Sequence, residues 1–455
     1  MAITGGALLK APKLTTRGGI LAVLGVILLI VSPFAGERGL EAVASGVVLL
    51  ILLMGLSMYS AVKHATIMRL RVRRILPEAI REGREYRVRV VIENPTPVPL
   101  ELVEVSDNLP PTWRSQGETT VLTVPPHGSV WYEYTVIPTP GKHAIGPLTM
   151  VYRDPLGVSE ARATIPLQVE VGVQPRLLDV PRRLVGVAGH SPAGSVRSRR
   201  RGLGLLFMEV REYHPEDDYR FIDWKSTARR GMPMVKVFEH EAVSNVIVAL
   251  DITRTLFHGR VGRTKFEYTL RLASSLVEYM ARRGYTYKLI IIPPNGQTVS
   301  TPWLRGRMST GRGKKFIAEN SPWPRNPGET VFAFSERRAA ALEREILKSL
   351  GRSRTFILLI SDFFEDAYSA EKYAEALSRL KALGNDVYAI TPLTAVFEAQ
   401  ELGEAAGYYR LLAYNEIKKY DIIKSALTRR GIRMVVTGPR DLLALIIGKI
   451  EVLSA

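Results

Sequence analysis

The sequence predicts a multidomain protein with three parts in order: a pair of membrane-spanning helices, an all-β sandwich, and an α/β domain with a doubly wound parallel sheet. Three observations predict this order. Two long apolar runs lie near the N-terminus, short alternating runs separated by Pro and Gly follow them, and apolar strands alternate with amphipathic helices in the second half of the chain. The chain has 455 residues, which is room for two or three domains.

Two apolar stretches, residues 18–35 and 42–62, are predicted to form a membrane-spanning hairpin. Helices of these lengths reach roughly 27–32 Å, which is enough to cross a bilayer core of about 30 Å. A cleaved signal peptide is the alternative for the first stretch. It fits poorly, because the second stretch begins directly after the short loop 36–41.

Charged residues around the hairpin predict its orientation. The loop between the two stretches offers only Arg38, whereas many Lys and Arg flank the hairpin outside it. The flanking residues are Lys10, Lys13, Arg17, Lys63, Arg69, Arg71, Arg73 and Arg74. By the positive-inside rule, residues 1–17 and everything after residue 63 face the cytoplasm, so the chain is expected in the cell membrane with two spans.

The composition indicates an anionic partner and argues against thiolate and zinc sites. The net charge is +18, from 62 Lys and Arg against 44 Asp and Glu, which is typical of proteins that bind nucleic acid or a membrane surface. The basic flank of the hairpin accounts for part of this charge, because it would lie against anionic lipid headgroups. The chain has no Cys, and its 7 His form no metal-binding motif, so disulfides, thiolate sites and a zinc enzyme are not expected.

Residues 70–175 are predicted to form an all-β, immunoglobulin-like sandwich. The runs 86–92 and 130–136 alternate between apolar and polar residues, and Pro- and Gly-rich turns separate such runs. This pattern is typical of antiparallel sandwiches. The aromatic residues expected in the core rather than in a ligand site are Trp113, Trp131 and Tyr134. A role as spacer or interaction module is expected.

Residues 245–455 are predicted to form the α/β domain. The predicted strands are 245–250, 287–292, 355–360, 386–390 and 433–436. The predicted helices are 266–283, 335–350, 367–383, 411–430 and 441–452. Strands that alternate with helices in this way form a parallel, doubly wound sheet. A long Pro- and Gly-rich insertion, 293–327, interrupts the alternation.

Polar residues follow two of these strands and form a candidate metal site. Asp251 ends the first strand and Asp362 follows the third, so both lie at the sheet edge where ligands of such sheets bind. Thr253 and Thr255 add hydroxyl groups to the loop after the first strand. Hard oxygen ligands of this kind suit Mg²⁺ or Mn²⁺ better than zinc.

The spacing Asp-x-Thr-x-Thr resembles the Asp-x-Ser-x-Ser of the von Willebrand factor A domain, a Rossmann-type fold with a metal-ion-dependent adhesion site at this place. The resemblance implies that Asp362 is the second aspartate of the site. It also implies a further Thr ligand, for which Thr330, in a Gly-x-Thr before a helix, is the best match. The alternative is that both Asp cap helices or pair with Arg254 or Arg260.

The connector 176–244 begins with a basic run. Residues 197–201 are Arg-Ser-Arg-Arg-Arg, followed closely by Gly. No aromatic residues interleave this run as they would in a nucleic-acid site. It is therefore predicted to be an exposed, flexible loop or to touch phospholipid.

The segment 211–229 resembles the signature of the DUF58 family, whose members are membrane-anchored proteins with a von Willebrand A-like domain. Its matching residues are Arg211, Tyr213, Asp217, Arg220, Ile222, Asp223, Trp224, Lys225, Ala228 and Arg229. One departure is Glu216, where the family usually has Gly. Acids and Arg around one Trp suit a segment fixed by Arg–carboxylate pairs and an aromatic anchor. A structural role, joining the sandwich to the α/β domain, is expected rather than a catalytic one.

Together these features predict a membrane-anchored cytoplasmic scaffold or adaptor rather than an enzyme. Neutral hydroxyls leave a divalent cation short of anionic ligands, so its open position favours a carboxylate of a partner protein. The resemblance implies that this partner is a MoxR-type AAA+ ATPase, with a role in assembling or maturing protein complexes.

Two rival functions stay open. The net charge suggests a binder of nucleic acid or of a lipid surface, of which nucleic acid is the less favoured. A metal-dependent hydrolase would need a nucleophile or a second metal, and the sequence offers no Gly-x-Ser-x-Gly elbow and no P-loop.

Overall fold

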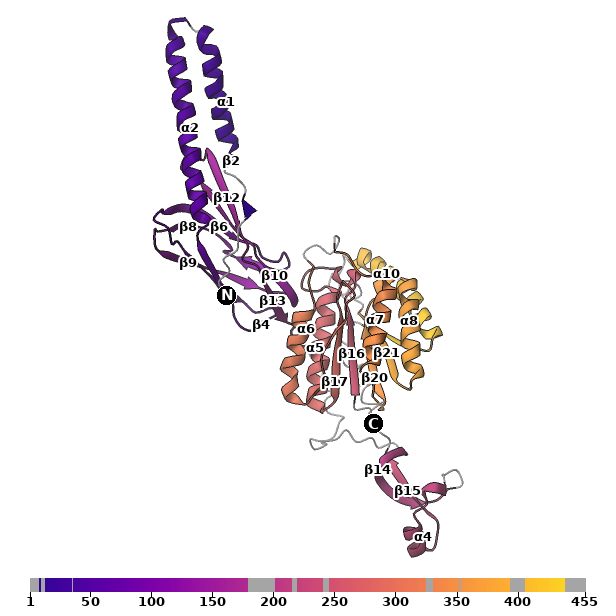
Figure 1. The fold of residues 1–455 in the computed structure, drawn as a ribbon. Helices are drawn as coiled ribbons and strands as arrows, with labels where there is room; N and C mark the ends of the chain where they lie inside the picture. Colours follow the sequence, from indigo (N-terminus) through magenta and orange to yellow (C-terminus); the bar gives the residue numbers. More distant parts are fainter. Residues whose placement is uncertain are drawn as a thin grey trace. The chain divides into compact units, whose positions relative to one another are not determined.

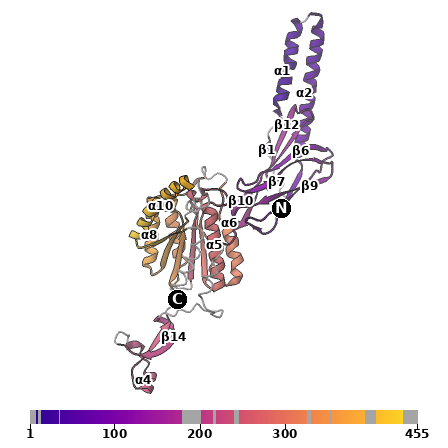
Figure 2. The ribbon, with the colours of Figure 1, turned by 180° about the vertical axis from the view of Figure 1, so that it is seen from behind.

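The computed structural model describes residues 8–9, 13–34, 36–178, 201–214, 219–239, 245–324, 330–351, 353–392 and 406–437. The chain divides into two compact units, residues 1–139 with 143–173 and residues 140–142 with 174–455. The first unit holds a helical hairpin and antiparallel sheets, and the second holds a mixed sheet covered by helices (Figure 1, Figure 2).

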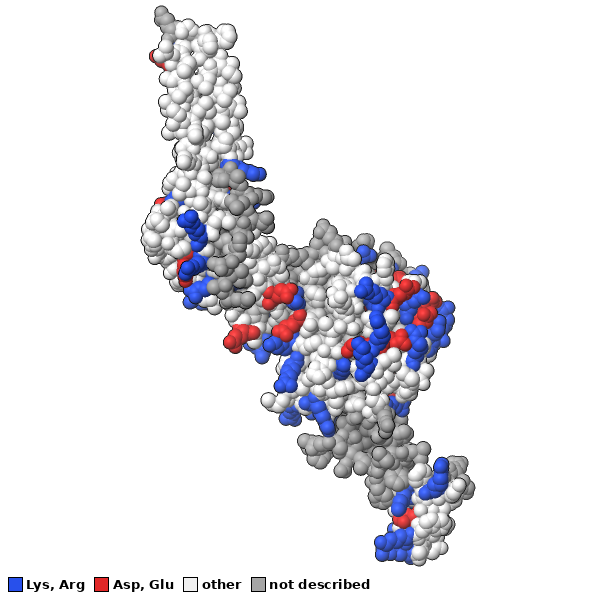
Figure 3. All heavy atoms as spheres, viewed as in Figure 1, with Lys and Arg blue, Asp and Glu red and all other residues white. Residues whose placement is uncertain are grey.

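Two long helices open the first unit. They are α1 (Thr16–Val31) and α2 (Gly39–Ile67), joined by the 3-10 turns η1 (Ser32–Phe34) and η2 (Gly36–Arg38). Their most apolar windows have mean hydropathies of 2.1 and 2.2, so both are long and apolar enough to cross a membrane. Figure 3 shows their shafts almost bare of charged side chains. The helices approach closely at Gly46, where a Cβ would lie 3.0 Å from the carbonyl oxygen of Gly25.

Polar contacts join the base of this hairpin to the strands that follow. Lys63, near the end of α2, donates to Glu101 Oε2 at 2.8 Å. Thr15, which caps the start of α1, donates from its hydroxyl to the carbonyl oxygen of Gly157 at 2.6 Å. Because both helices are held at the base, the hairpin and the strands form one unit.

The strands after α2 are β3 (Arg71–Ile75), β4 (Ile80–Arg81), β5 (Tyr86–Glu93), β6 (Leu100–Asp107), β7 (Arg114–Gln116), β8 (Thr119–Val124), β9 (Ser129–Ile137), β10 (Gly141–Ile145), β11 (Leu148–Arg153), β12 (Ser159–Ile165) and β13 (Val169–Gln174). The runs predicted to alternate, 86–92 and 130–136, are confirmed as β5 and β9.

These strands form three sheets. Their orders are β12-β11-β6-β8, which β1 (Leu8–Leu9) and β2 (Lys13–Leu14) extend at β12, then β3-β5-β9-β7, and β10-β13-β4. Neighbouring strands of the first two sheets run antiparallel. Alternate residues of both sheets, such as Val90 of β5 and Val105 of β6, are buried in one shared apolar core. The two sheets therefore pack on each other.

The predicted aromatic core residues divide between the two faces of their sheet. Trp113 and Tyr134 are buried as expected. The prediction for Trp131 is wrong, because its side chain is 58% exposed. Successive residues of a strand point to opposite faces, so the burial of Tyr132 turns Trp131 outward. There the Arg89 guanidinium lies 4.8 Å from its ring centroid.

A buried ion pair joins the two packed sheets. Arg74 of β3 donates to both carboxylate oxygens of Asp107 in β6, at 2.6 and 2.8 Å. The hydroxyl of Tyr134 in β9 donates to the same carboxylate at 2.7 Å. The side chains of Arg74 and Asp107 are 3% and 0% exposed, so this carboxylate depends on these donors rather than on water.

The connector, which showed little periodicity in the sequence, contains a hairpin of strands. β14 (Arg201–Glu212) pairs antiparallel with β15 (Met234–Glu239). The 3-10 turn η3 (Tyr219–Phe221) and the helix α4 (Trp224–Arg230) lie between these strands in the chain. Residues 197–200 of the basic run lie outside the described residues, so its predicted flexibility stays a prediction.

The second unit is built on one mixed sheet. Its strands are β16 (Asn245–Asp251), β17 (Thr286–Ile292), β18 (Val299–Ser300), β19 (Leu304–Arg305), β20 (Thr355–Ile360), β21 (Asp386–Pro392) and β22 (Arg433–Thr437). The order is β18-β17-β16-β20-β21-β22, with β19 also paired to β17. Strands β17, β16, β20, β21 and β22 are parallel, and β18 and β19 run antiparallel to β17.

Helices cover both faces of this sheet. The helical segments are η4 (Arg254–Phe257), α5 (Lys265–Arg283), η5 (Arg307–Ser309), α6 (Thr310–Asn320), α7 (Ser335–Leu347), η6 (Phe363–Glu365), α8 (Ala367–Ala382) and α10 (Ala406–Arg429). Residues of α5 and α6 join one apolar core, and residues of α7, α8 and α10 join another on the opposite side of β16 (Figure 1).

Most predicted elements of this unit are confirmed, with two exceptions. The helix predicted at 441–452 lies outside the described residues. The insertion 293–327 was expected only as a Pro- and Gly-rich stretch, yet it contains β18, β19 and α6. Helix α6 was missed because Gly311 and Gly313 weaken its helical pattern.

We expect Asp107→Ala to reduce the free energy of unfolding by about 3–5 kcal/mol, because it leaves the Arg74 guanidinium buried without a counter-charge. Urea unfolding of the purified chain measures the change. The matched control is Glu133→Ala, which breaks the exposed pair of Glu133 with Arg89 and should cost about 0–1 kcal/mol. Equal losses in the two variants would contradict the importance of the buried pair.

Candidate functional site

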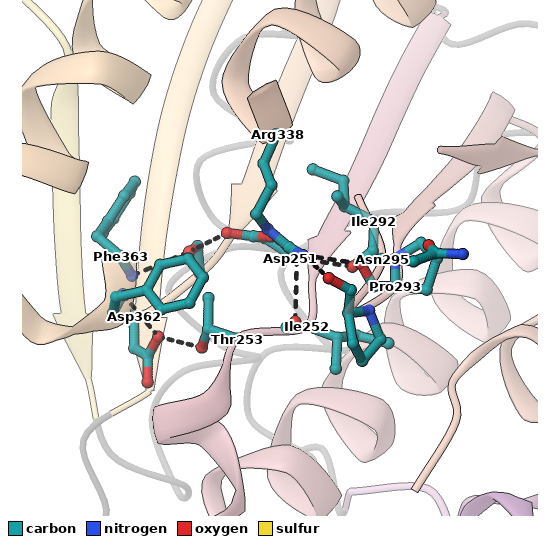
Figure 4. Close-up of polar contacts among 12 residues, drawn as sticks. Asp251, Ile252, Thr253, Ile292, Pro293, Asn295, Arg338, Asp362 and Phe363 are labelled. Carbon is teal, nitrogen blue, oxygen red and sulfur yellow. Dashed lines mark hydrogen bonds and ion pairs between the residues drawn. The ribbon is translucent and has the colours of Figure 1, made fainter. Parts of the chain in front are cut away.

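The sheet edge at the carboxyl ends of β16 and β20 carries the candidate site (Figure 4). The two strands are parallel neighbours, with Leu250 paired to Ile360. Asp251 directly follows Leu250 at the end of β16, and Asp362 lies two residues beyond Ile360, so both are brought to the same edge. The chain leaves β16 toward β17 on one side, while β20 lies on the other. Ligands of open α/β sheets bind at such a switch point.

Asp251 is held by a buried arginine. The side chains of Asp251 and Arg338, from α7, have no exposed surface and form an ion pair. Arg338 donates to Oδ1 of Asp251 from Nε at 3.0 Å and again from Nη2. The hydroxyl of Ser361 donates to Oδ2 at 2.8 Å. Both carboxylate oxygens of Asp251 therefore already accept hydrogen bonds from the protein.

The same guanidinium also ties down the backbone at this edge. Its Nη2 donates to the carbonyl oxygens of Ile252 at 3.0 Å and Ile292 at 2.9 Å. Its Nη1 donates to those of Pro293 at 2.8 Å and Pro294 at 3.1 Å. Arg338 therefore fixes the ends of β16 and β17 as well as the Asp251 side chain. Figure 4 shows the Arg338 side chain with dashed lines to these partners.

Unlike Asp251, which pairs with Arg338, Asp362 has hydroxyl groups as its side-chain neighbours. Thr253 donates to its Oδ1 at 2.5 Å, and the Thr255 hydroxyl lies 3.3 Å from that of Thr253. The Phe364 N–H donates to the same Oδ1 at 3.2 Å. The other oxygen, Oδ2, is buried and has no hydrogen-bond partner among the described residues. A buried, unsatisfied carboxylate oxygen needs an explanation, and a bound cation is one.

Burial raises the pKa of Asp362, because the protein interior disfavours its ionised form. The positive charge of Lys265 and the hydrogen bonds from Thr253 and Thr255 oppose this shift only in part. Lys265 itself is engaged elsewhere, donating to Glu365 Oε1 at 2.5 Å and to the Tyr420 hydroxyl at 2.9 Å. The negative charge of Asp362 is therefore only partly compensated.

The turn after Asp362 has an unusual backbone. Phe363, Phe364 and Glu365 have φ values of 54°, 56° and 55°, in the left-handed region. For a residue other than glycine, this conformation costs roughly 1–2 kcal/mol. Burial of the Phe363 ring in the apolar core offsets part of this cost. The turn directs the Phe364 N–H to Asp362 and places the Phe364 ring centroid 5.6 Å from the Arg338 guanidinium.

Some of the predicted ligands fit a hard divalent cation better than others. Asp362, Thr253 and Thr255 fit, because together they offer an unsatisfied carboxylate oxygen and two adjacent hydroxyls. Asp251 does not offer a free charge, because Arg338 neutralises it. Sequence reasoning had weighed Arg254 and Arg260 as its partners, and the structure places Arg338 there instead. In the described part of the chain, no three His, Cys, Asp or Glu side chains cluster as a metal site.

Thr330, the further ligand that the resemblance implies, stays a prediction. The loop 325–329 before it lies outside the described residues. The chain just after it is near the site, because the Phe332 and Phe364 ring centroids are 6.4 Å apart. Thr330 as a ligand is compatible with that contact.

The sequence carried a signal for Arg338 that went unused. Helix α7 buries Ser335, Ala339, Leu342 and Ile346, which recur at helical spacing, and Arg338 lies on the same stripe. A charged residue on the apolar stripe of a helix is rarely buried without a partner of opposite charge. That signal predicts a buried ion pair, but it does not say with which carboxylate.

The signature residues lie in the β14–β15 hairpin, apart from Asp217, which lies outside the described residues. Arg211 and Tyr213 lie at the end of β14, and Arg220 is in η3. Asp223 precedes α4 and accepts a hydrogen bond from the Ser226 hydroxyl at 2.8 Å, which lowers the pKa of its carboxyl group. Four signature residues of α4 are exposed: Trp224, Lys225, Ala228 and Arg229. The aromatic anchor expected from the sequence is thus a solvent-facing ring.

Residues 209–396 match a family model described as "Protein of unknown function DUF58". The uncharacterized protein YeaD of Bacillus subtilis (strain 168) is 25% identical over 215 residues, which cover 44% of this chain and 50% of that protein. The chain thus matches about half the length of this relative.

Similarities to solved structures are weak. Trypsin-activated alpha-2-macroglobulin from Escherichia coli matches 79% of this chain and 24% of its own, at 11% identity and a TM-score of 0.20. A GH20 exo-beta-N-acetylglucosaminidase from Vibrio harveyi matches 81% of this chain and 75% of its own, at 10% identity and a TM-score of 0.24. TM-scores this low carry no argument about fold or function.

We expect Arg338→Met to reduce the free energy of unfolding by about 3–5 kcal/mol, because Asp251 would stay buried without its counter-charge. Thermal unfolding of the purified chain measures the loss. Adding Asp251→Asn to this variant should restore part of it, since the amide carries no charge.

The matched control for this prediction is Arg379→Met. Arg379 pairs with both oxygens of Glu343 at 2.6 Å, but its side chain is 60% exposed, so its loss should cost about 0–1 kcal/mol. If the Arg338 and Arg379 variants were equally stable, or if the second substitution gave no recovery, the buried pair would not organise this edge.

Proposed function

Residues 209–396 belong to the DUF58 family, and from this premise we propose that the chain is a membrane-anchored adaptor that binds a protein partner through a divalent cation. One observation carries the proposal. Oδ2 of Asp362 is buried at the carboxyl edge of the sheet without a hydrogen-bond partner in the described part of the chain, beside the hydroxyls of Thr253 and Thr255.

The proposed cation is Mg²⁺ or Mn²⁺. Asp362, Thr253 and Thr255 would hold it, with Thr330 as a further ligand, and Asp251 would support the site from behind through Ser361. Such a cation supplies an electrophilic position for an oxygen ligand from outside the chain. Because Arg338 neutralises Asp251, the described residues leave Asp362 as a carboxylate whose charge is only partly compensated. A divalent cation there keeps positive charge and favours an acidic side chain of the partner.

The proposed folds agree with this role. The order β17-β16-β20-β21-β22, with the candidate residues after β16 and β20, supports a von Willebrand A-like domain with its metal-ion-dependent adhesion site. The packed antiparallel sheets of the first unit support an immunoglobulin-like sandwich that acts as a spacer or interaction module. Both assignments rest on strand order and on the residues at the strand ends.

The proposed location is the cell membrane, with the domains on the cytoplasmic side. Helices α1 and α2 are long and apolar enough to span a bilayer. Lys13 and Arg17 flank the first helix and the basic group 69–74 follows the second, whereas the turn between the helices offers Arg38. This asymmetry supports a hairpin whose two ends both face the cytoplasm.

The resemblance to DUF58 proteins suggests a MoxR-type AAA+ ATPase as the partner. A shared role in assembling or maturing protein complexes fits a scaffold that presents a cation to an acidic residue. Metal-dependent hydrolysis is the weaker proposal, because the sequence offers neither a Gly-x-Ser-x-Gly elbow nor a P-loop. Binding of nucleic acid rests only on the net charge of +18.

We expect Asp362→Asn to abolish the response of the chain to divalent cations. Wild-type protein with Mn²⁺ at 100 times its Kd should gain about 2.7 kcal/mol of stability, and the variant should gain none. Without cation the variant should be at least as stable as wild type, since it loses an ionised, buried and unsatisfied carboxylate. Thermal unfolding with Mn²⁺ or with chelator measures both effects.

The pH dependence follows from the raised pKa of Asp362. Its folded-state pKa lies above the unfolded value, so the contribution of Asp362 to stability without cation is greatest at low pH and is lost as pH rises through the folded pKa. The cation should stabilise only above that pKa, where the carboxylate is ionised. A stabilisation by Mn²⁺ that is the same at acid and neutral pH would contradict Asp362 as the ligand.

Capture of the ATPase tests the partner. Loss of one charged contact at an interface costs about 2–5 kcal/mol, so chelator or Asp362→Asn should weaken capture roughly 30-fold or more. The matched control is Asp386→Asn. Asp386 also has a buried oxygen without a partner among the described residues, but Arg354 balances its charge at 2.7 Å. If the Asp386→Asn control lost the ATPase, or if the wild-type chain still captured it in chelator, the proposal of a cation-bridged adaptor would be overturned.

A further inference from the structure

The β14–β15 hairpin carries most of the family signature, yet the proposed cation site makes no use of it. The hairpin is locally well fixed. The Asp223 N–H donates to the Met234 carbonyl oxygen at 2.8 Å, and the Met234 N–H donates to the Thr227 hydroxyl at 3.0 Å. Helix α4 is therefore bonded, at both its start and its middle, to Met234, the first residue of β15. The residues that α4 exposes are held in place by this bonding.

The exposed side of this element is aromatic and apolar. The side chains of Tyr219 and Trp224 are 73% and 72% exposed, and Met232 is 43% exposed. All three lie within the stretch from η3 to the turn after α4. Tyr and Trp combine an apolar ring with a polar tip, and such residues collect at surfaces that are apolar on one side and wet on the other.

The same element also exposes positive charge. Lys225, Arg229 and Arg230 of α4 are exposed, and Lys225 and Arg229 share a helix face because they are four residues apart. The acid of this segment, Asp223, is partly buried and lies 3.6 Å from Lys236. On this element Figure 3 shows more Lys and Arg than Asp and Glu among otherwise uncharged atoms. We call the set Tyr219, Trp224, Lys225, Arg229, Arg230 and Met232 the basic-aromatic face.

We propose that the basic-aromatic face binds an anionic lipid surface. Trp and Tyr favour the headgroup region of bilayers, and Lys and Arg near a membrane surface gain attraction from anionic lipids. The inference rests on the membrane anchoring proposed above, because the hairpin of α1 and α2 would keep this face close to lipid at a high effective concentration. A protein surface, including a second copy of the chain, is the competing occupant.

The chain has no Cys, so a single introduced Cys can carry a polarity-sensitive fluorophore. Ala228→Cys places it on the exposed face of α4, and Ala340→Cys on α7 gives a matched exposed helical position as the control. Full-length protein is placed one copy per nanodisc, in phosphatidylcholine alone or with phosphatidylglycerol. We expect a blue-shifted emission and quenching by nitroxide lipids for the label at 228, only in the anionic discs, and no change for the label at 340.

Charge variants identify the cause of this shift. Replacing Lys225, Arg229 and Arg230 together with Ala should lower the ratio of lipid-bound to free face roughly 100-fold, at about fivefold for each basic residue. The charge-conserving set Lys225→Arg, Arg229→Lys and Arg230→Lys should keep the shift, which excludes a folding defect. Trp224→Ser should reduce quenching by nitroxides placed deep in the bilayer.

The outcomes separate this inference from the proposed anchoring and cation site. If the chain failed to enter the discs, the anchoring would be wrong and the inference would fall with it. Entry into the discs without a shift at 228 would overturn the inference alone. An equal shift in neutral and anionic discs would overturn the role of the charges. A shift that appears in detergent as protein concentration rises, but not in discs, would assign the face to a second copy.

Discussion

The guanidinium of Arg338 lies wholly inside the second unit, where water cannot satisfy its N–H groups. It meets this constraint by donating to Asp251 and to carbonyl oxygens at the ends of β16 and β17. Helix α7 is thereby tied to two strands through one side chain. The ion pair also neutralises Asp251, whereas the negative charge of Asp362 is only partly compensated. Everything proposed for the site follows from this division between two carboxylates.

Asp362 owes its position to a backbone that few residues adopt. The left-handed turn 363–365 costs conformational energy, and buried packing of Phe363 helps to hold it. In return, the turn donates the Phe364 N–H to Oδ1, which also accepts from Thr253, while Oδ2 has no donor in the described part of the chain. Strain next to an unsatisfied acid is the kind of local cost that proteins keep where a ligand binds.

The strands of the second unit could be predicted because buried parallel strands are short apolar runs, as in 245–250 and 355–360. The placement of Asp251 and Asp362 at one edge followed from the same runs. The ion pair could not be predicted, because Arg338 is 87 residues from Asp251 and nothing local selects that partner. Trp131 was wrongly predicted to lie in the core because it is a large aromatic residue, whereas the alternation of β9 turns its side chain to solvent.

The β14–β15 hairpin shows a further limit of sequence reasoning. Its strands contain many charged residues and two glycines, so the sequence shows neither the helical nor the two-residue strand periodicity. Each strand is fixed by pairing with the other strand of the hairpin. The signature suggested an anchor of Arg–carboxylate pairs around Trp224. The structure instead presents Trp224 and its basic neighbours to the outside. Residue types indicated that the segment mattered, but only the fold shows which side chains remain available for a surface.

Anomalous diffraction from crystals of the full chain grown with Mn²⁺ tests the central claim most directly. The account predicts one anomalous peak at coordination distance from Asp362 Oδ2 and the hydroxyls of Thr253 and Thr255, with Arg338 still bonded to Asp251. A peak on Asp251 with Arg338 displaced would contradict the division between the two carboxylates. Crystals with no peak at this edge, at Mn²⁺ concentrations that saturate known sites of this kind, would contradict the cation site itself.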